Sequence, residues 1–414
     1  MIKVRFNLRK VVAIAICLAG TITISAQNVD VYAAGTDWKN AIIWKNGVEL
    51  YSIADERSDG EFDCIYVSGN DVYTGNTKMT RPNFSYEYHP YIWKNGNLLY
   101  ELETTDNYGF VDAIFVSGND VYACGSENSQ ASNAVVWKNG KIFNTLAKGY
   151  YNSSSNYLYY YANAMQIIDN DVYVVGYSSG NSSLGSNKTW KNGTELYSGG
   201  GSSGIVVSGN NIYTLSGTAV WKNGTVFYQL DKNSTATSFC VVGNDVYVAG
   251  YENTIWARNV ATVWKNGEVI YRLDDEPQST SQLTGATADD ICVIDNDVYV
   301  LTHNYSYKKT FIWKNGVVLY NSENQRVNAI FVQSSKTGIE NIKTQNMQIY
   351  PNPVRDELFI QREIGVDRIE IYDIAGKQMF TGNLTNNNSI NVSKLPAGIY
   401  VLKIGNHSEK FVKE

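Results

Sequence analysis

The sequence predicts an all-β protein, a seven-bladed β-propeller followed by a small C-terminal β-sandwich of the immunoglobulin-like kind. Three observations support this prediction. The tetrapeptide Trp-Lys-Asn-Gly occurs seven times. A second signature, Asp or Asn followed by Val or Ile and then Tyr, precedes each copy. Residues 347–414 contain neither signature. One repeat unit covers about 43 residues, a length typical of a propeller blade.

Each repeat unit reads as four short strands joined by tight turns. In the third unit the apolar runs 113–116 and 121–125 flank Gly118-Asn119, and the runs 134–137 and 141–143 flank Asn139-Gly140. Gly-Asn and Asn-Gly pairs adopt the positive φ values of two-residue hairpin turns. A unit is therefore expected to form two hairpins, which together make a four-stranded antiparallel blade. The tetrapeptides begin at Trp44, Trp93, Trp137, Trp190, Trp221, Trp264 and Trp313.

The two ends of the repeat region complement each other. The first unit begins at Asp30 without its first strand, and residues 327–332 repeat the missing piece at the end. A seven-bladed ring over residues 27–332, sealed by strands from both ends, removes the exposed sheet edges that an open array would leave. An open solenoid is the alternative. The repeats fit a propeller of unassigned family.

Antiparallel connectivity predicts two different faces. All tight turns must lie on one side of the ring, and all longer connections on the other. The tight-turn face carries seven Lys from the tetrapeptides and six Asp from the second signature, so its charges nearly cancel and we expect it to be solvated. The seven repeated Trp are expected to lie in the core or flank the hairpins, since repetition at one strand position indicates packing.

The longer connections are rich in aromatic residues. Tyr and Trp offer flat, rigid and half-polar contact area at small entropic cost, which suits sugar rings or another protein. Rigidly held loops are also where binding groups commonly lie. The candidate ligand-binding residues are Trp38, Tyr86, Tyr88, Tyr108, Tyr151, Tyr159, Trp256 and Tyr305. Residues 76–90 and 147–162, which hold four of them, are expected to be irregular loops.

The usual catalytic constellations are missing from the sequence. It has 31 Tyr and 9 Trp but only 3 His, and it contains no HExxH motif and no Gly-rich phosphate loop. Acidic residues gather at 55–61 and 274–290, where two carboxylates about 5–9.5 Å apart could hydrolyse a glycoside. The spacing of a calcium loop is missing. We assign no catalytic residue, metal ligand or cofactor. A glycan-cleaving enzyme and an adhesin or structural surface protein remain alternatives to a binding module.

The first 26 residues predict export. Four basic residues precede an apolar run from 11 to about 24, and Ser25-Ala26 follows, the three parts of a secretory signal peptide. Removing the leader takes away four positive charges, so the net charge moves from −6 to −10. An acidic chain disfavours nucleic acid as a partner. No later apolar stretch reaches 18 residues, so no transmembrane segment is expected in the mature chain.

Four cysteines follow the leader, each within an apolar strand-like run. Buried free thiols are favoured over two disulfides, because Cys behaves as a small apolar residue in cores.

After a polar segment at 333–346, interpreted as a linker, residues 347–414 carry a different set of motifs. They include the runs 349–354, 371–377 and 395–404, and Lys-Phe-Val-Lys near the end. In order and composition these motifs resemble the C-terminal sorting domain of type IX secretion, the Por system. The residues that carry the resemblance are Tyr350, Pro351, Asn352, Pro353, Gly376, Leu395, Pro396, Gly398 and Tyr400.

The resemblance implies the partner and the address of the protein. Members of the family are exported across the outer membrane by the type IX secretion machinery of Bacteroidetes-type bacteria, and then released or attached to surface lipopolysaccharide. It implies nothing about what the exported part does. The sequence therefore predicts a secreted or surface-attached propeller that binds a glycan or a protein through its longer connections.

Overall fold

The computed structural model describes residues 29–54, 61–153, 156–181, 185–253, 259–273, 285–304, 309–334, 348–361, 368–373, 377–383, 389–404 and 407–414. The chain divides into two compact units, Met1–Ser335 and Lys336–Glu414. The predicted leader, most of the predicted linker, Trp256, Tyr305 and Gly376 lie outside the described residues.

Seven antiparallel sheets make up the described part of the first unit. Sheet 1 contains β29 (Arg326–Ser334), β1 (Val29–Thr36), β2 (Asn40–Lys45) and β3 (Val48–Ala54); sheet 2 contains β4 (Cys64–Ser68), β5 (Asp71–Thr80), β6 (Glu87–Lys94) and β7 (Asn97–Glu101), with the 3₁₀ turn η1 (Pro82–Phe84). Sheet 3 contains β8 (Gly109–Ser117), β9 (Asp120–Glu127), β10 (Asn133–Lys138) and β11 (Lys141–Ala147); sheet 4 contains β12 (Tyr150–Ser153), β13 (Asn156–Ile168), β14 (Asp171–Gly180), β15 (Asn187–Lys191) and β16 (Thr194–Ser198).

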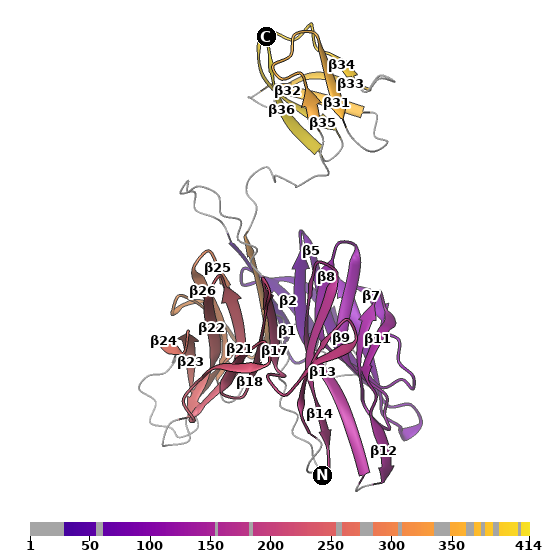
Figure 1. Cartoon of the computed structure of the whole chain (residues 1–414), viewed down its shortest axis with the longest axis vertical. Coiled ribbons are helices and arrows are strands. Elements are labelled where there is room, and N and C mark those ends of the chain that lie inside the picture. Colours follow the sequence, from indigo (N-terminus) through magenta and orange to yellow (C-terminus); the bar gives the residue numbers. More distant parts are fainter. Residues whose placement is uncertain are drawn as a thin grey trace. The chain divides into compact units, whose positions relative to one another are not determined.

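The remaining three sheets repeat the pattern. Sheet 5 contains β17 (Gly204–Ser208), β18 (Asn211–Ser216), β19 (Ala219–Lys222) and β20 (Thr225–Gln229); sheet 6 contains β21 (Ser234–Val242), β22 (Asp245–Asn253), β23 (Asn259–Lys265) and β24 (Glu268–Leu273); sheet 7 contains β25 (Ala286–Ile294), β26 (Asp297–Asn304), β27 (Lys309–Lys314) and β28 (Val317–Glu323). In Figure 1 the fourth strands β7, β11 and β24 lie at the periphery of this unit.

The sheets contact one another in sequence order and return to the start. One strand of each sheet contacts the sheet that follows; these strands are β4, β8, β13, β17, β21, β25 and β29, and the contact of β29 with β4 returns to sheet 2. Strand β29 also pairs antiparallel with β1, with Val31 opposite Val332 and Ala33 opposite Ile330. The predicted all-β propeller is confirmed, and strands from both ends of the repeat region seal it.

The residues of the two repeated signatures contact each other at the tight turns. In sheet 2, the Lys94 ammonium contacts Asp71 at 2.8 Å and lies 5.3 Å from the centre of the Tyr73 ring. The Asn95 side chain donates to Asp71 at 2.8 Å and accepts from the N–H of Val72 at 2.8 Å. The same ion pair forms in six sheets, at 2.7–2.9 Å. Each copy therefore ties one tight turn to its neighbour within the blade.

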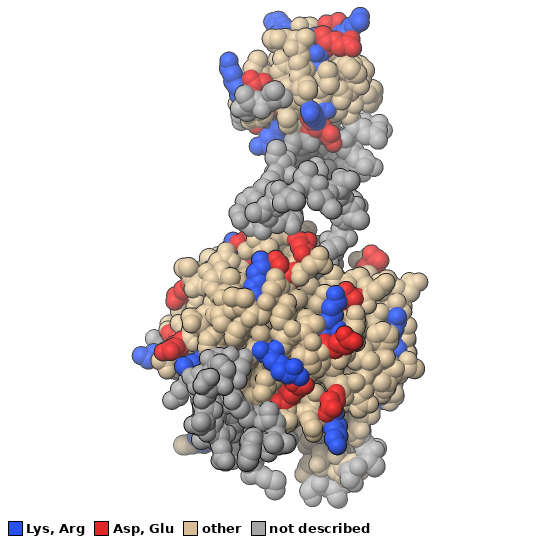
Figure 2. All heavy atoms as spheres, turned by 90° about the vertical axis from the view of Figure 1, so that its left-hand side faces the viewer, with Lys and Arg blue, Asp and Glu red and all other residues tan. Residues whose placement is uncertain are grey.

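Sheet 5 is the exception to this arrangement. It has Asn211 where the other sheets have Asp, and Lys222 lies over the Tyr213 and Phe227 rings at 5.2 and 5.3 Å. On the surface seen in Figure 2, basic side chains mostly stand beside acidic ones. The expected near-cancellation of charge on the tight-turn face thus takes the form of paired side chains.

The glycine of each tetrapeptide touches the preceding sheet. The Tyr51 ring covers Gly96, the Tyr271 ring covers Gly316, and the Tyr320 ring of sheet 7 covers Gly47 of sheet 1. A Cβ at Gly47 would lie 2.6 Å from the Tyr320 ring. All seven glycines have φ values of 75–87°, which favour Gly, and at Gly47 and several other copies the close approach of the preceding sheet also leaves no room for a side chain.

Apolar packing between sheets forms the core. Of the repeated Trp, five are buried and Trp93 and Trp221 are half-buried, as expected for packing residues. All four described cysteines are buried and free, which confirms the thiol interpretation. Burial raises the pKa of Cys292 to about 12.

The C-terminal unit has two sheets around its own core. One contains β30 (Gln348–Tyr350), β31 (Glu357–Gln361) and β34 (Ser389–Asn391); the other contains β33 (Gln378–Asn383), β32 (Arg368–Asp373), β35 (Gly398–Ile404) and β36 (His407–Lys413). Leu358, Ile371, Leu402 and Phe411 are among the buried residues that join them. This unit is β-rich, as predicted.

Candidate ligand-binding face

We call the side of the propeller that carries the longer connections the long-loop face, and the opposite side the short-turn face. Several connections predicted to be irregular are strands that prolong the hairpins. Strand β5 extends to Thr80 and strand β6 begins at Glu87. Most of residues 147–162 form β12 and the first half of β13. The loop prediction was wrong for these residues, because the cross-strand pairing of the hairpins continues beyond the repeated strands.

Two exposed aromatic side chains occupy unfavourable backbone positions on this face. Trp38, between β1 and β2, has a φ of 74° and is 55% exposed, and Phe84, in the turn between β5 and β6, has a φ of 65° and is 88% exposed. A left-handed conformation costs a bulky residue about 1–3 kcal/mol and is often found where function requires it.

Local hydrogen bonds hold the Trp38 turn in place. The Asp37 carboxylate accepts from the N–H groups of Lys39 at 2.9 Å and Asn40 at 2.7 Å, and the N–H of Trp38 donates to Thr36 Oγ1 at 2.8 Å. Burial alone would raise the pKa of Asp37, but these backbone donors hold it below its usual value. The indole is therefore presented to solvent by an ordered turn.

Aromatic and cationic groups meet in sheet 2. The Arg81 guanidinium lies 4.7 Å from the centre of the Tyr86 ring and 5.9 Å from that of Phe84, and Tyr86 is 50% exposed. Tyr88 and Tyr108, two of the predicted binding residues, contact each other at 4.9 Å between ring centres. The structure thus brings Tyr88 and Tyr108 together as a support between β6 and the start of β8, while Tyr86 points outward.

Sheet 4 carries a row of tyrosines, which we call the tyrosine ladder: Tyr151, Tyr157, Tyr159, Tyr161 and Tyr177. Tyr151 pairs with Tyr157 and Tyr161 with Tyr177, and alternate residues of β13 lie on one side of the sheet about 7 Å apart. Ring centres are 5.2 Å apart for Tyr157 and Tyr159 and 4.8 Å apart for Tyr161 and Tyr177. Burial and the neighbouring phenols raise the pKa of Tyr159.

The sequence placed Tyr151 and Tyr159 among the candidates, and the pairing shows that both belong to the ladder. Tyr151, at its end, is 52% exposed. Period-two spacing over 157–161 was the signal that could have revealed the row.

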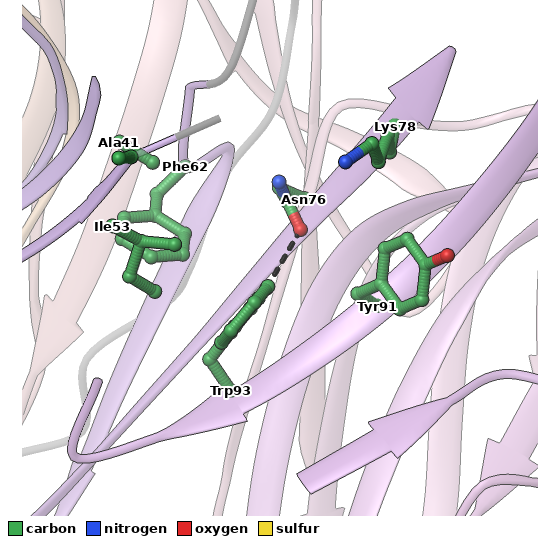
Figure 3. Close-up of a pocket in the computed structure, with 8 residues that line it drawn as sticks. Ala41, Ile53, Phe62, Asn76, Lys78, Tyr91 and Trp93 are labelled. Atoms are coloured by element: carbon green, nitrogen blue, oxygen red, sulfur yellow. Dashed lines mark hydrogen bonds between the residues drawn. The ribbon is translucent and has the colours of Figure 1, made fainter. Parts of the chain in front are cut away.

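A small hollow of about 60 Å³ opens between sheets 1 and 2, and the sequence did not single it out. Figure 3 shows Ala41, Ile53 and Phe62 on one side, and Asn76, Lys78, Tyr91 and Trp93 of β5 and β6 on the other. The Trp93 indole donates to Asn76 Oδ1 at 2.8 Å. The alternate spacing of Asn76 and Lys78 in β5, and of Tyr91 and Trp93 in β6, could have predicted that they share one side of sheet 2. It could not have predicted that residues of sheet 1 line the hollow opposite them.

Three acidic residues of the predicted acidic segments lie in the described part of the chain, and two of them, Glu61 and Asp290, join neighbouring sheets. Glu61 contacts Arg326 of β29 at 3.2 Å. Asp289 contacts the buried His303 at 2.5 Å. Asp290 accepts from Ser238 Oγ at 2.9 Å and from the N–H of Ile330 at 3.0 Å, and so joins three sheets. The geometry therefore gives these carboxylates a structural role.

In the C-terminal unit, the motif residues fix the last strand. Asn352 accepts from the N–H of Val412 at 2.9 Å and donates to the carbonyl of Lys410 at 3.1 Å. The Tyr400 hydroxyl donates to the carbonyl of Pro396 at 2.8 Å, and its ring stacks on Phe411 at 5.6 Å. Gly398 pairs with Lys413. Tyr350 is exposed and stacks on Phe359.

Residues 348–414 match the family described as the secretion system C-terminal sorting domain. They form a type IX sorting domain. The sorting domain directs the protein to the outer cell surface, and its partner in export is the type IX secretion machinery. The resemblance seen in the sequence is confirmed.

Some solved structures are similar to this chain at low identity and low TM-score. PorZ, described as a surface component of the type IX secretion system of Porphyromonas gingivalis, is 12% identical with a TM-score of 0.36, covering 91% of this chain and 64% of that one. The extracellular domain of the hybrid two component system BT3049 from B. thetaiotaomicron is 9% identical with a TM-score of 0.39, covering 93% and 54%. The periplasmic gluconolactonase of Pseudomonas aeruginosa is 8% identical with a TM-score of 0.33, covering 92% and 99%.

This chain thus spans about two thirds of the length of PorZ. A search among curated proteins finds no match. Among the residues that the structure describes, none belongs to a helix with the length and apolarity of a membrane span.

Proposed function

We propose that the propeller is a binding module of the outer cell surface that takes a glycan or a protein through its long-loop face. The observation that carries the proposal is the pair of exposed aromatic residues, Trp38 and Phe84, held in left-handed conformations at loop tips on that face. Backbone strain of this kind persists only where the surroundings enforce it.

The proposed contact surface consists of Trp38, Phe84, Tyr86 and the tyrosine ladder with Tyr151 and Tyr159. Tyr88 and Tyr108 support it from below, and Trp256 and Tyr305 remain predicted members. Exposed Tyr and Trp are typical of binding hot spots. The short-turn face differs, since six of its seven repeated Lys are already paired with Asp.

The test is a binding screen of the mature chain against glycans and surface proteins, repeated with Trp38→Ala and Tyr151→Ala. A hot-spot aromatic should cost about 2 kcal/mol, a roughly 30-fold loss of affinity. The matched controls are Phe143→Ala and Phe227→Ala, which remove exposed rings beside the tight turns. Equal losses from all four variants, with unchanged melting temperatures, would contradict a binding surface on the long-loop face.

A further inference from the structure

On the long-loop face, sheet 5 ends earlier than its neighbour, sheet 4. The repeated Tyr of the second strand gives a common reference point in both sheets. Strand β18 continues for three residues after Tyr213, to Ser216, whereas β14 continues for seven residues after Tyr173, to Gly180. At about 3.3 Å per residue, the hairpin of β13 and β14 extends roughly 13 Å beyond the end of sheet 5. This difference in length leaves a step between the two sheets.

The tyrosine ladder lies on the part of the hairpin that extends past this step, on the side that faces sheet 5. Ala164 and Val175, which are opposite each other in β13 and β14, pack with Ile205 of β17. Tyr177 follows Val175 by two residues, so its side chain lies on the same side of the sheet, and Tyr161 is opposite Tyr177. The strands of sheet 5 therefore end before they reach these rings.

The ladder keeps part of its surface open to solvent. Ring contacts run along the row, yet Tyr151 is 52% exposed and Tyr177 is 36% exposed. Ser179, opposite Tyr159 in the pairing of β13 with β14, is also exposed. From 157 to 161 the row covers about 13 Å of strand. The ladder is therefore an open flank, longer than one sugar unit, and not an enclosed cavity.

The sequence of this hairpin carries no charge. No Asp, Glu, Lys, Arg or His occurs at 149–168 or at 172–187, although charged residues make up 18% of the chain. Within 149–161 and 177–187, 22 of the 24 residues are Tyr, Ser, Asn or Gly. The same four residue types dominate antibody binding loops, where Tyr supplies rigid half-polar contact area and the others supply adaptable hydrogen bonds. The composition is therefore that of a recognition surface for an uncharged ligand.

The lack of charge favours a neutral glycan over a protein. Protein surfaces carry charged residues at roughly a quarter to a third of their positions, and a charge placed against an uncharged surface loses its water without gaining a partner. A neutral glycan offers hydroxyl groups and apolar C–H groups, which match the hydroxyl groups and the rings of the ladder. An open flank also accepts a linear chain that continues past both ends of the row.

We propose that the tyrosine ladder binds a neutral, linear glycan that lies along β13 at the step where sheet 5 ends. The sugar units contact the rings of Tyr151, Tyr157 and Tyr161, and their hydroxyl groups exchange hydrogen bonds with the phenols and with Ser179. The inference rests on the proposed function and narrows it, because it names the class of glycan and its place on the long-loop face.

The experiment inserts a charge of either sign into the uncharged surface. Calorimetry measures the binding of cellohexaose, xylohexaose, mannohexaose, chitohexaose and maltohexaose to the mature chain, with hexagalacturonate as the charged probe. The variants are Ser179→Asp and Ser179→Lys, together with Tyr157→Ala, which removes one ring. The matched controls are Thr194→Asp and Thr194→Lys, at an exposed position of β16 beside a tight turn of the same sheet. Trp fluorescence melts verify that each variant is folded.

We expect at least one of the neutral hexasaccharides to bind. Ser179→Asp and Ser179→Lys should each weaken its binding about tenfold or more, because either charge loses its water against an uncharged ligand. Tyr157→Ala should weaken binding by a similar factor, as the loss of a central aromatic residue does in other interfaces. Both Thr194 variants should bind like the wild type. Added salt should have little effect, since the ligand has no charge to screen.

Three results overturn the inference. The first is that no neutral hexasaccharide binds, and the second is that the Ser179 and Tyr157 variants bind as tightly as the wild type. The third is that the two charges at Ser179 change the affinity in opposite directions, as a charged ligand requires. If hexagalacturonate or a surface protein binds instead and Trp38→Ala weakens it, the proposed function stands without this inference. If no glycan or protein binds at all, both proposals fail.

Discussion

The contact of Tyr320 with Gly47 joins sheet 7 to sheet 1, and it makes ring closure testable by a single methyl group. Gly47 has a φ of 77°, and a Cβ there would lie 2.6 Å from the Tyr320 ring. Gly69, in a turn of sheet 2, has a φ of 61° and nothing within 4 Å of the same position. Gly47→Ala and Gly69→Ala therefore share the backbone penalty but differ in the collision.

The backbone term is about 1–2 kcal/mol for an L-residue in the left-handed region. Overpacking against the tyrosine adds about 1–3 kcal/mol for Gly47→Ala. We expect Gly69→Ala to lower the free energy of unfolding of the propeller by about 1–2 kcal/mol and Gly47→Ala by about 2–5 kcal/mol.

Urea unfolding followed by Trp fluorescence measures the propeller alone, because all nine Trp precede residue 332. In a Tyr320→Ala background, Gly47→Ala should cost no more than Gly69→Ala, since the colliding ring is gone. Equal costs of the two glycine substitutions in the wild-type background would refute the contact between sheets 7 and 1.

Three further predictions concern charge, thiols and export. Hydrogen bonds from Lys94 and, to a smaller extent, Asn95 lower the pKa of Asp71. Hydrogen bonds with Asp71 and, to a smaller extent, Tyr73 raise the pKa of Lys94. This ion pair should therefore stabilise the fold between about pH 4 and 10. That contribution is lost as the pH falls through the lowered pKa of Asp71 or rises through the raised pKa of Lys94. Asp71→Asn should flatten both limbs of a stability profile measured by urea titration, and an unchanged profile would count against the pair. Burial raises the pKa of Cys292 to about 12 and that of Cys240 well above its usual value, so the native thiols should resist iodoacetamide at pH 8 and react only in denaturant; labelling of the native chain would disprove their burial. Asn352→Ala and deletion of 347–414 should reduce or abolish the amount of protein at the cell surface, measured by immunoblot of intact-cell and periplasmic fractions, whereas Ser393→Ala, at an exposed position, should not; normal export of the deletion variant would contradict the sorting role.

The sequence was sufficient for the architecture because the repeat is regular. Asn-Gly and Gly-Asn turns, the missing first strand before Asp30 and its counterpart at 327–332 together predict hairpins and a sealed ring. The pairing of Lys94 with Asp71, by contrast, needed the structure, since the two residues are distant in sequence and only the hairpin register brings them together.

The candidate site was predicted only in part. Exposure of Trp38, Tyr86 and Tyr151 follows from their position between the strands of the repeat. The mutual packing of Tyr88 and Tyr108 does not, because it depends on two connections meeting across sheets. The hollow could not be predicted from the sequence for the same reason, because its apolar and polar walls come from different sheets.

The most direct test of the account is hydroxyl-radical footprinting of the mature chain with and without the tightest-binding probe of the screen. If the long-loop face is the binding surface, Trp38, Tyr86 and Tyr151 should be protected when the ligand is added, while Phe143 and Phe227 beside the tight turns should react as before. Protection of Phe143 and Phe227, with Trp38, Tyr86 and Tyr151 unchanged, would contradict it.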